Sequence, residues 1–143
     1  MDQNLVLGAW KLKSFVYKAE DGSNFYPYGK DASGIIIYEK GGYMSAVITR
    51  TDRPRLTTED FGLLSDEEKI ALAKGFMTYT GNYEVQSDRI LHNIEIGYIP
   101  NWAGTTFVRF PSFDDDGNLV LATPPINLRG KSFTGYLIWK KAD

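Results

Sequence analysis

Hydrophobic and polar side chains alternate along most of this 143-residue chain, in short runs separated by turn-forming residues. Alternation with a period of two is typical of strands that bury one face. Eight such runs occur, over residues 8–17, 34–38, 43–49, 81–85, 89–98, 105–113, 119–123 and 132–139. The pattern therefore predicts an all-β fold of about eight strands, a number that suits a small closed antiparallel barrel.

The first and last runs each alternate around a tryptophan, Trp10 and Trp139. If these two strands pair, the sheet closes on itself and encloses an interior in which a small molecule can lie. We expect both tryptophans to seal the ends of the barrel, with Lys140 over the Trp10 ring.

One segment breaks the alternation. Ser65 and Glu68 have the spacing of a capping box, in which each side chain satisfies a free backbone amide at the start of a helix. The apolar residues that follow recur at helical spacing and predict a helix over residues 66–79, with Gly75 inside it. We expect this helix to plug one mouth of the barrel or to pack on its outer wall.

The amino-acid composition limits which kinds of protein this chain can be. Hydrophobic residues make up 43% of the chain and aromatic residues 14%. This content and the chain length predict one hydrophobic core, and therefore one domain spanning residues 1–143. There is no cysteine, which excludes disulfides, thiolate metal sites and a cysteine nucleophile. With a net charge of −2 and no basic stripe, neither nucleic acid nor a membrane surface is an expected partner.

Targeting signals and catalytic signatures are also missing. The start of the chain lacks a secretory signal, and no apolar run is long enough to span a membrane, so we expect a cytoplasmic protein. The sequence has no nucleophile elbow, phosphate-binding glycine loop or dinucleotide fingerprint. Hydrolase, kinase and dehydrogenase activities are therefore not expected.

Several short motifs together resemble a known family. They are Gly8-Ala-Trp10-Lys-Leu12, Tyr26-Pro27-Tyr28-Gly29, Tyr38-x-x-x-Gly42-Tyr43-Met44-Ser45-Ala46, Arg50-x-x-Arg53-Pro54, Asn101-Trp102-x-Gly104-Thr105 and Leu137-x-Trp139. In this order they resemble the bacterial and fungal lipocalin-like domains of the calycin superfamily. The resemblance implies an antiparallel barrel with a central ligand cavity. Relatives of the same architecture include both binders and cyclases or isomerases of secondary metabolism. The lack of cysteine departs from the secreted lipocalins.

His92 is the only histidine, and it alternates in phase with Ile90, Ile94 and Ile96. If the isoleucine face is interior, His92 is a neutral imidazole among apolar walls, suited to act as a base or to bind a ligand. It can equally be a core histidine bonded to one hydroxyl. In the opposite phase Glu95 is interior instead, unless a bulge intervenes.

Arg109 is the other candidate for interior chemistry, because an inward arginine can hold a ligand carboxylate or enolate. The outward alternative, an arginine that solvates the sheet, stays open. Tyr43 is a third candidate catalytic residue, as a phenol that donates to a developing enolate. The residues that we expect to contact a ligand are Tyr28, Met44, Tyr83, Ile94, Trp102, Phe107 and Tyr136.

Two functions fit these residues, and a third fits the fold alone. The first is binding of a small hydrophobic or amphipathic molecule in the cavity. The second is a cofactor-independent cyclase or isomerase acting on a polyketide-like or other unsaturated metabolite. The third is a barrel filled by its own aromatic residues, serving as a structural module. We expect no metal and no cofactor, and a homodimer is possible.

Overall fold

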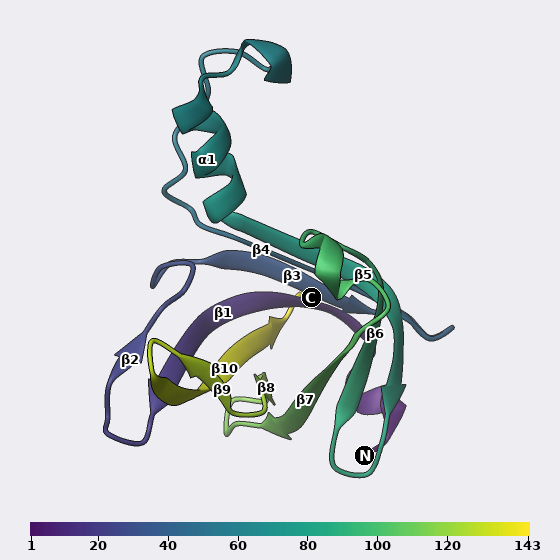
Figure 1. Cartoon of the computed structure of the whole chain (residues 1–143). Coiled ribbons are helices and arrows are strands. Elements are labelled where there is room, and N and C mark those ends of the chain that lie inside the picture. Colours follow the sequence, from purple (N-terminus) through teal and green to yellow (C-terminus); the bar gives the residue numbers. More distant parts are fainter.

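The computed structural model describes all residues 1–143, and its strands form one continuous antiparallel sheet (Figure 1). The strands are β1 (Gly8–Ala19), β2 (Asn24–Phe25), β3 (Ser33–Tyr38), β4 (Tyr43–Thr49), β5 (Phe76–Val85), β6 (Ile90–Gly97), β7 (Thr106–Phe113), β8 (Leu119–Ala122), β9 (Ile126–Leu128) and β10 (Lys131–Lys141). The helices are α1 (Asp66–Lys74) and the short 3-10 helices η1 (Gln3–Leu5), η2 (Phe61–Leu63) and η3 (Pro100–Trp102).

The sheet closes through the pairing of β1 with β10, which runs from Trp10 opposite Lys141 to Ala19 opposite Phe133. The strand order β1-β3-β4-β5-β6-β7-β8-β10 returns to β1, so eight strands form the barrel wall. The short strands β2 and β9 extend beside β1 and β10. The predicted closed eight-strand barrel is confirmed, and the two tryptophan strands are the pair that closes it.

A bulge in β6 changes which side chains point inward. Gly81 of β5 lies opposite Ile94, but the preceding residue Thr80 lies opposite Ile96, so Glu95 is an extra residue on β6. Ile90, His92 and Ile94 are buried, whereas Ile96 is turned outward and is 72% exposed. The expectation that Ile96 shares the face of His92 is therefore wrong, because an inserted residue reverses the alternation.

The bulge also explains the glycine opposite it. A Cβ atom on Gly81 would lie 1.9 Å from the backbone oxygen of Asn93, closer than any side chain permits. Only glycine lets β5 approach β6 this closely at the point where the register shifts.

The expected helix over residues 66–79 is only half right. The capping box between Ser65 and Glu68 is present, but α1 ends at Lys74 with Gly75 as its C-cap. From Phe76 onward the chain pairs with β4, beginning with Phe76 opposite Thr49. Cross-strand pairing and burial of Met77 and Tyr79 outweigh the helical spacing of the same residues.

The position of α1 also differs from the expectation. The helix buries no residue, and it projects away from one end of the barrel instead of plugging it (Figure 1). No helix in the structure is long and apolar enough to cross a membrane.

The end of the barrel near the N-terminus is sealed by side chains. Val6 is fully buried behind η1. The indole nitrogen of Trp10 donates a hydrogen bond to the backbone oxygen of Val6 at 2.9 Å. The ammonium of Lys141, not that of Lys140, lies 4.7 Å from the centre of the Trp10 ring. Trp10 is therefore an end seal, as expected.

Candidate functional site

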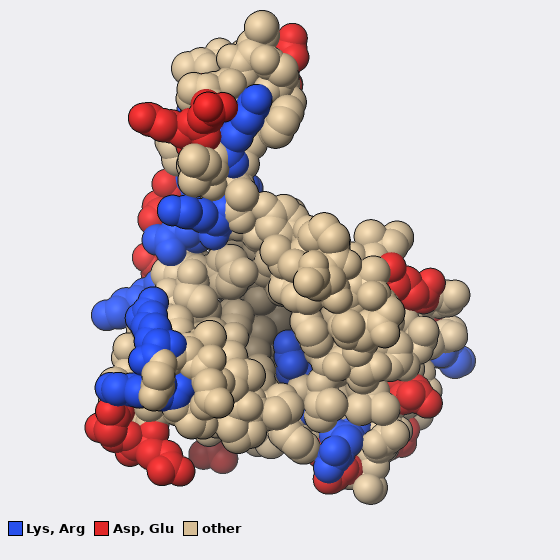
Figure 2. Space-filling view, viewed as in Figure 1, with Lys and Arg blue, Asp and Glu red and all other residues tan.

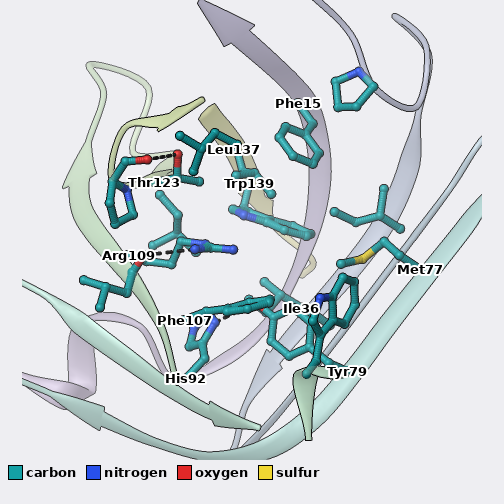
Figure 3. Close-up of a pocket in the computed structure, with 18 of the residues that line it drawn as sticks. Phe15, Ile36, Met77, Tyr79, His92, Phe107, Arg109, Thr123, Leu137 and Trp139 are labelled. Atoms are coloured by element: carbon teal, nitrogen blue, oxygen red, sulfur yellow. Dashed lines mark hydrogen bonds between the residues drawn. The ribbon is translucent and has the colours of Figure 1, made fainter. Parts of the chain in front are cut away.

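The interior of the barrel is hollow towards the end opposite Trp10 (Figure 2). The cavity has a volume of about 440 Å³, and 15 of its 21 lining residues are hydrophobic. Loop residues Pro27, Tyr28 and Pro124 border it, and Trp102 of η3 lies beside them. Figure 3 shows strand side chains converging on this space from several sides. The cavity can hold a small molecule with an apolar body.

His92 stands at the inner wall of this cavity, between two tyrosine hydroxyls. The Tyr38 hydroxyl lies 2.6 Å from Nε2 and the Tyr79 hydroxyl 2.7 Å from Nδ1, and all three side chains are buried. Burial, assisted by the positive charge of Arg109, holds the pKa of His92 well below its usual value of 6.5. A neutral imidazole has one donor and one acceptor nitrogen, so one tyrosine donates to the ring and the other accepts from it.

The two tyrosines of this group are held neutral. Burial raises the pKa of Tyr38 well above 10.0, and it also raises the pKa of Tyr79, against the opposing charge of Arg109. Tyr38, His92 and Tyr79 thus form a neutral, hydrogen-bonded group that joins β3, β6 and β5 across the interior. Tyr79 and His92 reach the cavity, and Tyr38 lies behind them.

Arg109 points into the cavity from β7, which settles the choice between its inward and outward orientations. It is the only lysine or arginine among the lining residues, and no Asp or Glu is among them. Figure 2 shows blue basic atoms inside the hollow. The one hydrogen bond that Arg109 makes runs from Nη1 to the backbone oxygen of Val108 at 2.9 Å. The guanidinium also lies beside the Tyr79 hydroxyl and opposes the rise of its pKa. No carboxylate balances its charge.

Trp139 lies in the same wall, 1% exposed, and its indole nitrogen has no hydrogen-bond partner. In Figure 3 the Arg109 side chain extends across the cavity towards the Trp139 indole. The expectation that Trp139 only seals an end of the barrel is wrong, because its ring lines the cavity. A buried indole N–H without an acceptor is uncommon, since leaving it unpaired costs about 1–3 kcal/mol.

Three aromatic rings form one side of the cavity. The ring centres of Trp102 and Phe107 are 5.4 Å apart, and Tyr79 lies 5.2 Å from Phe107 and 6.1 Å from Trp102, all in edge-to-face arrangements. The guanidinium of Arg109 lies 5.2 Å from the centre of the Phe107 ring. This wall offers aromatic surface next to a positive charge, an arrangement that suits a flat ligand.

The structure brings together only some of the residues expected at the site. His92, Arg109, Tyr28, Trp102 and Phe107 line the cavity. The other expected residues, Tyr43, Met44, Tyr83, Ile94 and Tyr136, do not.

The two tyrosines that point outward share a cause. Tyr43 is 57% exposed, because its neighbour Met44 takes the inward face of β4. Tyr136 faces outward between Gly135 and Leu137, and the ammonium of Lys18 lies 5.5 Å from its ring centre. Adjacent residues of a strand face opposite sides, so this error was readable from the alternation itself.

The other three residues are buried beyond the cavity. Met44 and Ile94 belong to the packed core. The Tyr83 hydroxyl donates to the backbone oxygen of Glu39 at 2.8 Å and accepts from the Gln3 amide. These residues pack in the core or hydrogen-bond near the closed end of the barrel.

Tyr79 and Trp139 are among the lining residues that were not expected from the sequence. Tyr79 was predicted to lie in the last turn of the helix, but it belongs to β5. Trp139 of β10 was predicted to seal an end of the barrel. Their alternation with Met77 and Leu137 marks both as inward, but depth along the barrel decides whether an inward residue meets a cavity. No group of three or more His, Asp or Glu side chains comes together as a metal site.

Comparison with known proteins agrees with this architecture. A family model described as a lipocalin-like domain matches residues 7–142, nearly the whole chain. The chain belongs to the lipocalin-like domain family. This lipocalin-like chain is also similar to the 4′-hydroxy-3′-methoxypropiophenone carrier protein of Aspergillus oryzae. The two are 26% identical over 106 residues, which cover 68% of this chain and 96% of the relative.

Proposed function

We propose that this lipocalin-like protein binds a small amphipathic aromatic molecule in its central cavity. The observation that carries the proposal is the cavity itself, an apolar space of about 440 Å³ with a single charged side chain, Arg109, on its wall. Small-molecule sites are commonly 300–1,000 Å³ in volume and mostly apolar, with a few polar groups that fix orientation. The Aspergillus relative is named as a carrier of an aromatic ketone with hydroxy and methoxy substituents, which supports the same kind of ligand.

Binding is favoured over catalysis by the state of His92. Both ring nitrogens already lie within hydrogen-bond distance of a tyrosine hydroxyl, so neither is free to take a proton from a substrate. Its lowered pKa further disfavours a protonated imidazole that would donate to one. The residue expected to act as a base is therefore engaged in holding the inner wall together.

The proposal is tested with 4′-hydroxy-3′-methoxypropiophenone as the probe. We expect saturable one-to-one binding. The quenching of tryptophan fluorescence measures it, because two tryptophans line the cavity. The ligand recovered after incubation is expected to be chemically unchanged by mass spectrometry. Conversion to a new product would support the cyclase or isomerase alternative.

A matched pair of variants locates the site. Ile36 lines the cavity and is 1% exposed, whereas its neighbour Ile35 faces outward and is 41% exposed. Ile36→Phe fills part of the cavity and is expected to weaken binding at least ~10-fold, while Ile35→Phe leaves affinity unchanged. Circular dichroism checks that both variants fold. Equal affinities in the two folded variants would exclude the cavity as the binding site.

A further inference from the structure

The cavity carries a positive charge that the protein does not balance. The titratable side chains that face it from other elements are Tyr17 on β1, Tyr28 in the loop before β3, Tyr79 on β5 and His92 on β6. Tyr38 of β3 lies behind His92. No carboxylate lines the cavity, and the three ion pairs of the structure are all elsewhere, at Arg50, Arg89 and Lys131.

None of these groups supplies a negative charge near neutral pH. Burial raises the pKa of Tyr17, Tyr28, Tyr38 and Tyr79, so their hydroxyls stay protonated. The pKa of His92 is lowered, so it stays neutral. The guanidinium of Arg109 keeps its charge throughout this range. The wall of the cavity therefore carries a net charge of about +1 in an apolar surrounding.

Arg109 holds hydrogen-bond donors that the protein does not use. Its Nη1 donates to the Val108 backbone oxygen and the guanidinium also lies beside the Tyr79 hydroxyl, which leaves further donors free. Nε1 of Trp139 has no acceptor either, but it is fully buried and out of the reach of a ligand. A neutral apolar ligand would leave the free Arg109 donors unpaired, and a negatively charged oxygen would accept from them.

We infer that the ligand is an aromatic organic anion whose charged oxygen accepts from the Arg109 guanidinium. This inference rests on the proposed function and names the chemical class of its ligand. The ring of the ligand lies against Trp102, Phe107 and Tyr79, whose edges and faces border the same space. The anion is a carboxylate or a phenolate, and Arg109 is the specificity-determining residue that selects for it.

The experiment compares ionisable probes with neutral analogues of nearly the same shape. The phenol probe is 4′-hydroxy-3′-methoxypropiophenone, and its neutral partner is 3′,4′-dimethoxypropiophenone. The carboxylate probe is 3-(4-methoxyphenyl)propanoate, and its neutral partner is the methyl ester. Affinities are measured by calorimetry between pH 6 and pH 9, and absorbance reports whether the bound phenol has lost its proton.

We expect the protein to prefer at least one anion over its neutral partner by ~10-fold or more. If the phenol is the preferred class, the bound phenol titrates about 1–2 pH units below the free phenol, because a neighbouring arginine favours the charged form. Its proton then passes to the buffer, and calorimetry in buffers of different ionisation enthalpy registers the release. If only the carboxylate probe binds more tightly than its neutral partner, the natural ligand is assigned to the carboxylates.

A variant assigns the preference to Arg109. Arg109→Met is expected to abolish it, while the neutral partners bind as they do to the wild type. Arg89→Met is the matched control, since Arg89 is paired with Asp88 at the exposed turn before β6 and leaves the cavity untouched.

The outcomes separate the inference from the proposed function. Neutral partners that bind within threefold of both anions would overturn the inference while leaving the binding function in place. A preference that persists in Arg109→Met would also overturn it. Failure of all four probes to bind would overturn the proposed function, and the inference with it.

Discussion

The sealed end of the barrel and the cavity differ in how their buried polar groups are paired. At the closed end the Trp10 indole donates to Val6, and the Tyr83 hydroxyl donates to Glu39. Next to it, His92 is bonded on both sides. In the cavity wall, Trp139 has no partner for its indole N–H, and Arg109 has one hydrogen bond to the backbone and no counter-charge. Paired polar atoms hold the barrel together, whereas the unbalanced charge of Arg109 is left for a ligand.

The comparison of Trp10 with Trp139 gives the largest expected effect on stability. Trp10→Ala removes a ring that is 3% exposed together with its hydrogen bond, and we expect the free energy of unfolding to fall by about 3–5 kcal/mol. Chemical denaturation measures this loss, and protein that remains folded is expected to bind the probe. Trp139→Phe, which removes an unpaired N–H, is expected to change stability by less than about 1 kcal/mol. Equal losses of unfolding free energy in the two variants would contradict the different roles of Trp10 and Trp139.

Acid tests the paired state of His92. In the unfolded chain its pKa is near 6.5, and in the folded protein the pKa is much lower. Below 6.5 the unfolded state therefore binds a proton that the folded state does not, and stability falls as the pH falls. We expect a loss of about 1.4 kcal/mol between pH 7.5 and pH 5.5.

The control for this pH effect is the variant His92→Phe. We expect it to be less stable than the wild type, because it leaves two tyrosine hydroxyls unpaired. Its free energy of unfolding is expected to be independent of pH between pH 7.5 and pH 5.5. Asp52, Asp88 and Asp114 have pKa values below 3.8 and contribute only in more acidic solution. A wild-type stability that is flat from pH 7.5 to pH 5.5 would contradict a neutral, buried His92.

The smallest expected effect is at Arg109. Arg109→Met removes a charge that no carboxylate balances and keeps much of the side-chain volume. We expect the free energy of unfolding to stay within about 1 kcal/mol of the wild type, or to rise, although anion binding is lost. Thermal denaturation of the ligand-free protein measures it. A loss of several kcal/mol would place Arg109 among the residues that hold the barrel together.

Local alternation predicted the barrel well because each strand buries one face over only a few residues. The eight wall strands and the closing pair follow from it, but it left open whether His92 or Glu95 points inward, and the structure places His92 inside. It failed at Ile96, where the bulge at Glu95 reverses the faces, and at Phe76 to Tyr79, where pairing with β4 replaces a helical pattern. In both places the partner strand decides the conformation, and the local sequence does not contain that information.

The site was predictable in part for the same reason. Arg109, Trp102 and Phe107 were recognised as candidates from residue type and position, but neither the inward turn of Arg109 nor the cavity beside Trp139 follows from spacing. Tyr43 was mistaken for an interior residue although its neighbour Met44 already took that face. Residue type suggests chemistry, and only the strand phase assigns it to a side of the wall.

By itself, then, the sequence determined that this chain closes into a barrel, because alternation and turns act over short stretches of chain. The tertiary structure decided which polar atoms inside the barrel find partners. Tyr38, Tyr79 and His92 come from three different strands to satisfy one another, whereas Trp139 meets no acceptor and Arg109 meets no carboxylate. Such pairing depends on groups far apart in the sequence, whose separation is fixed only when the sheet has closed.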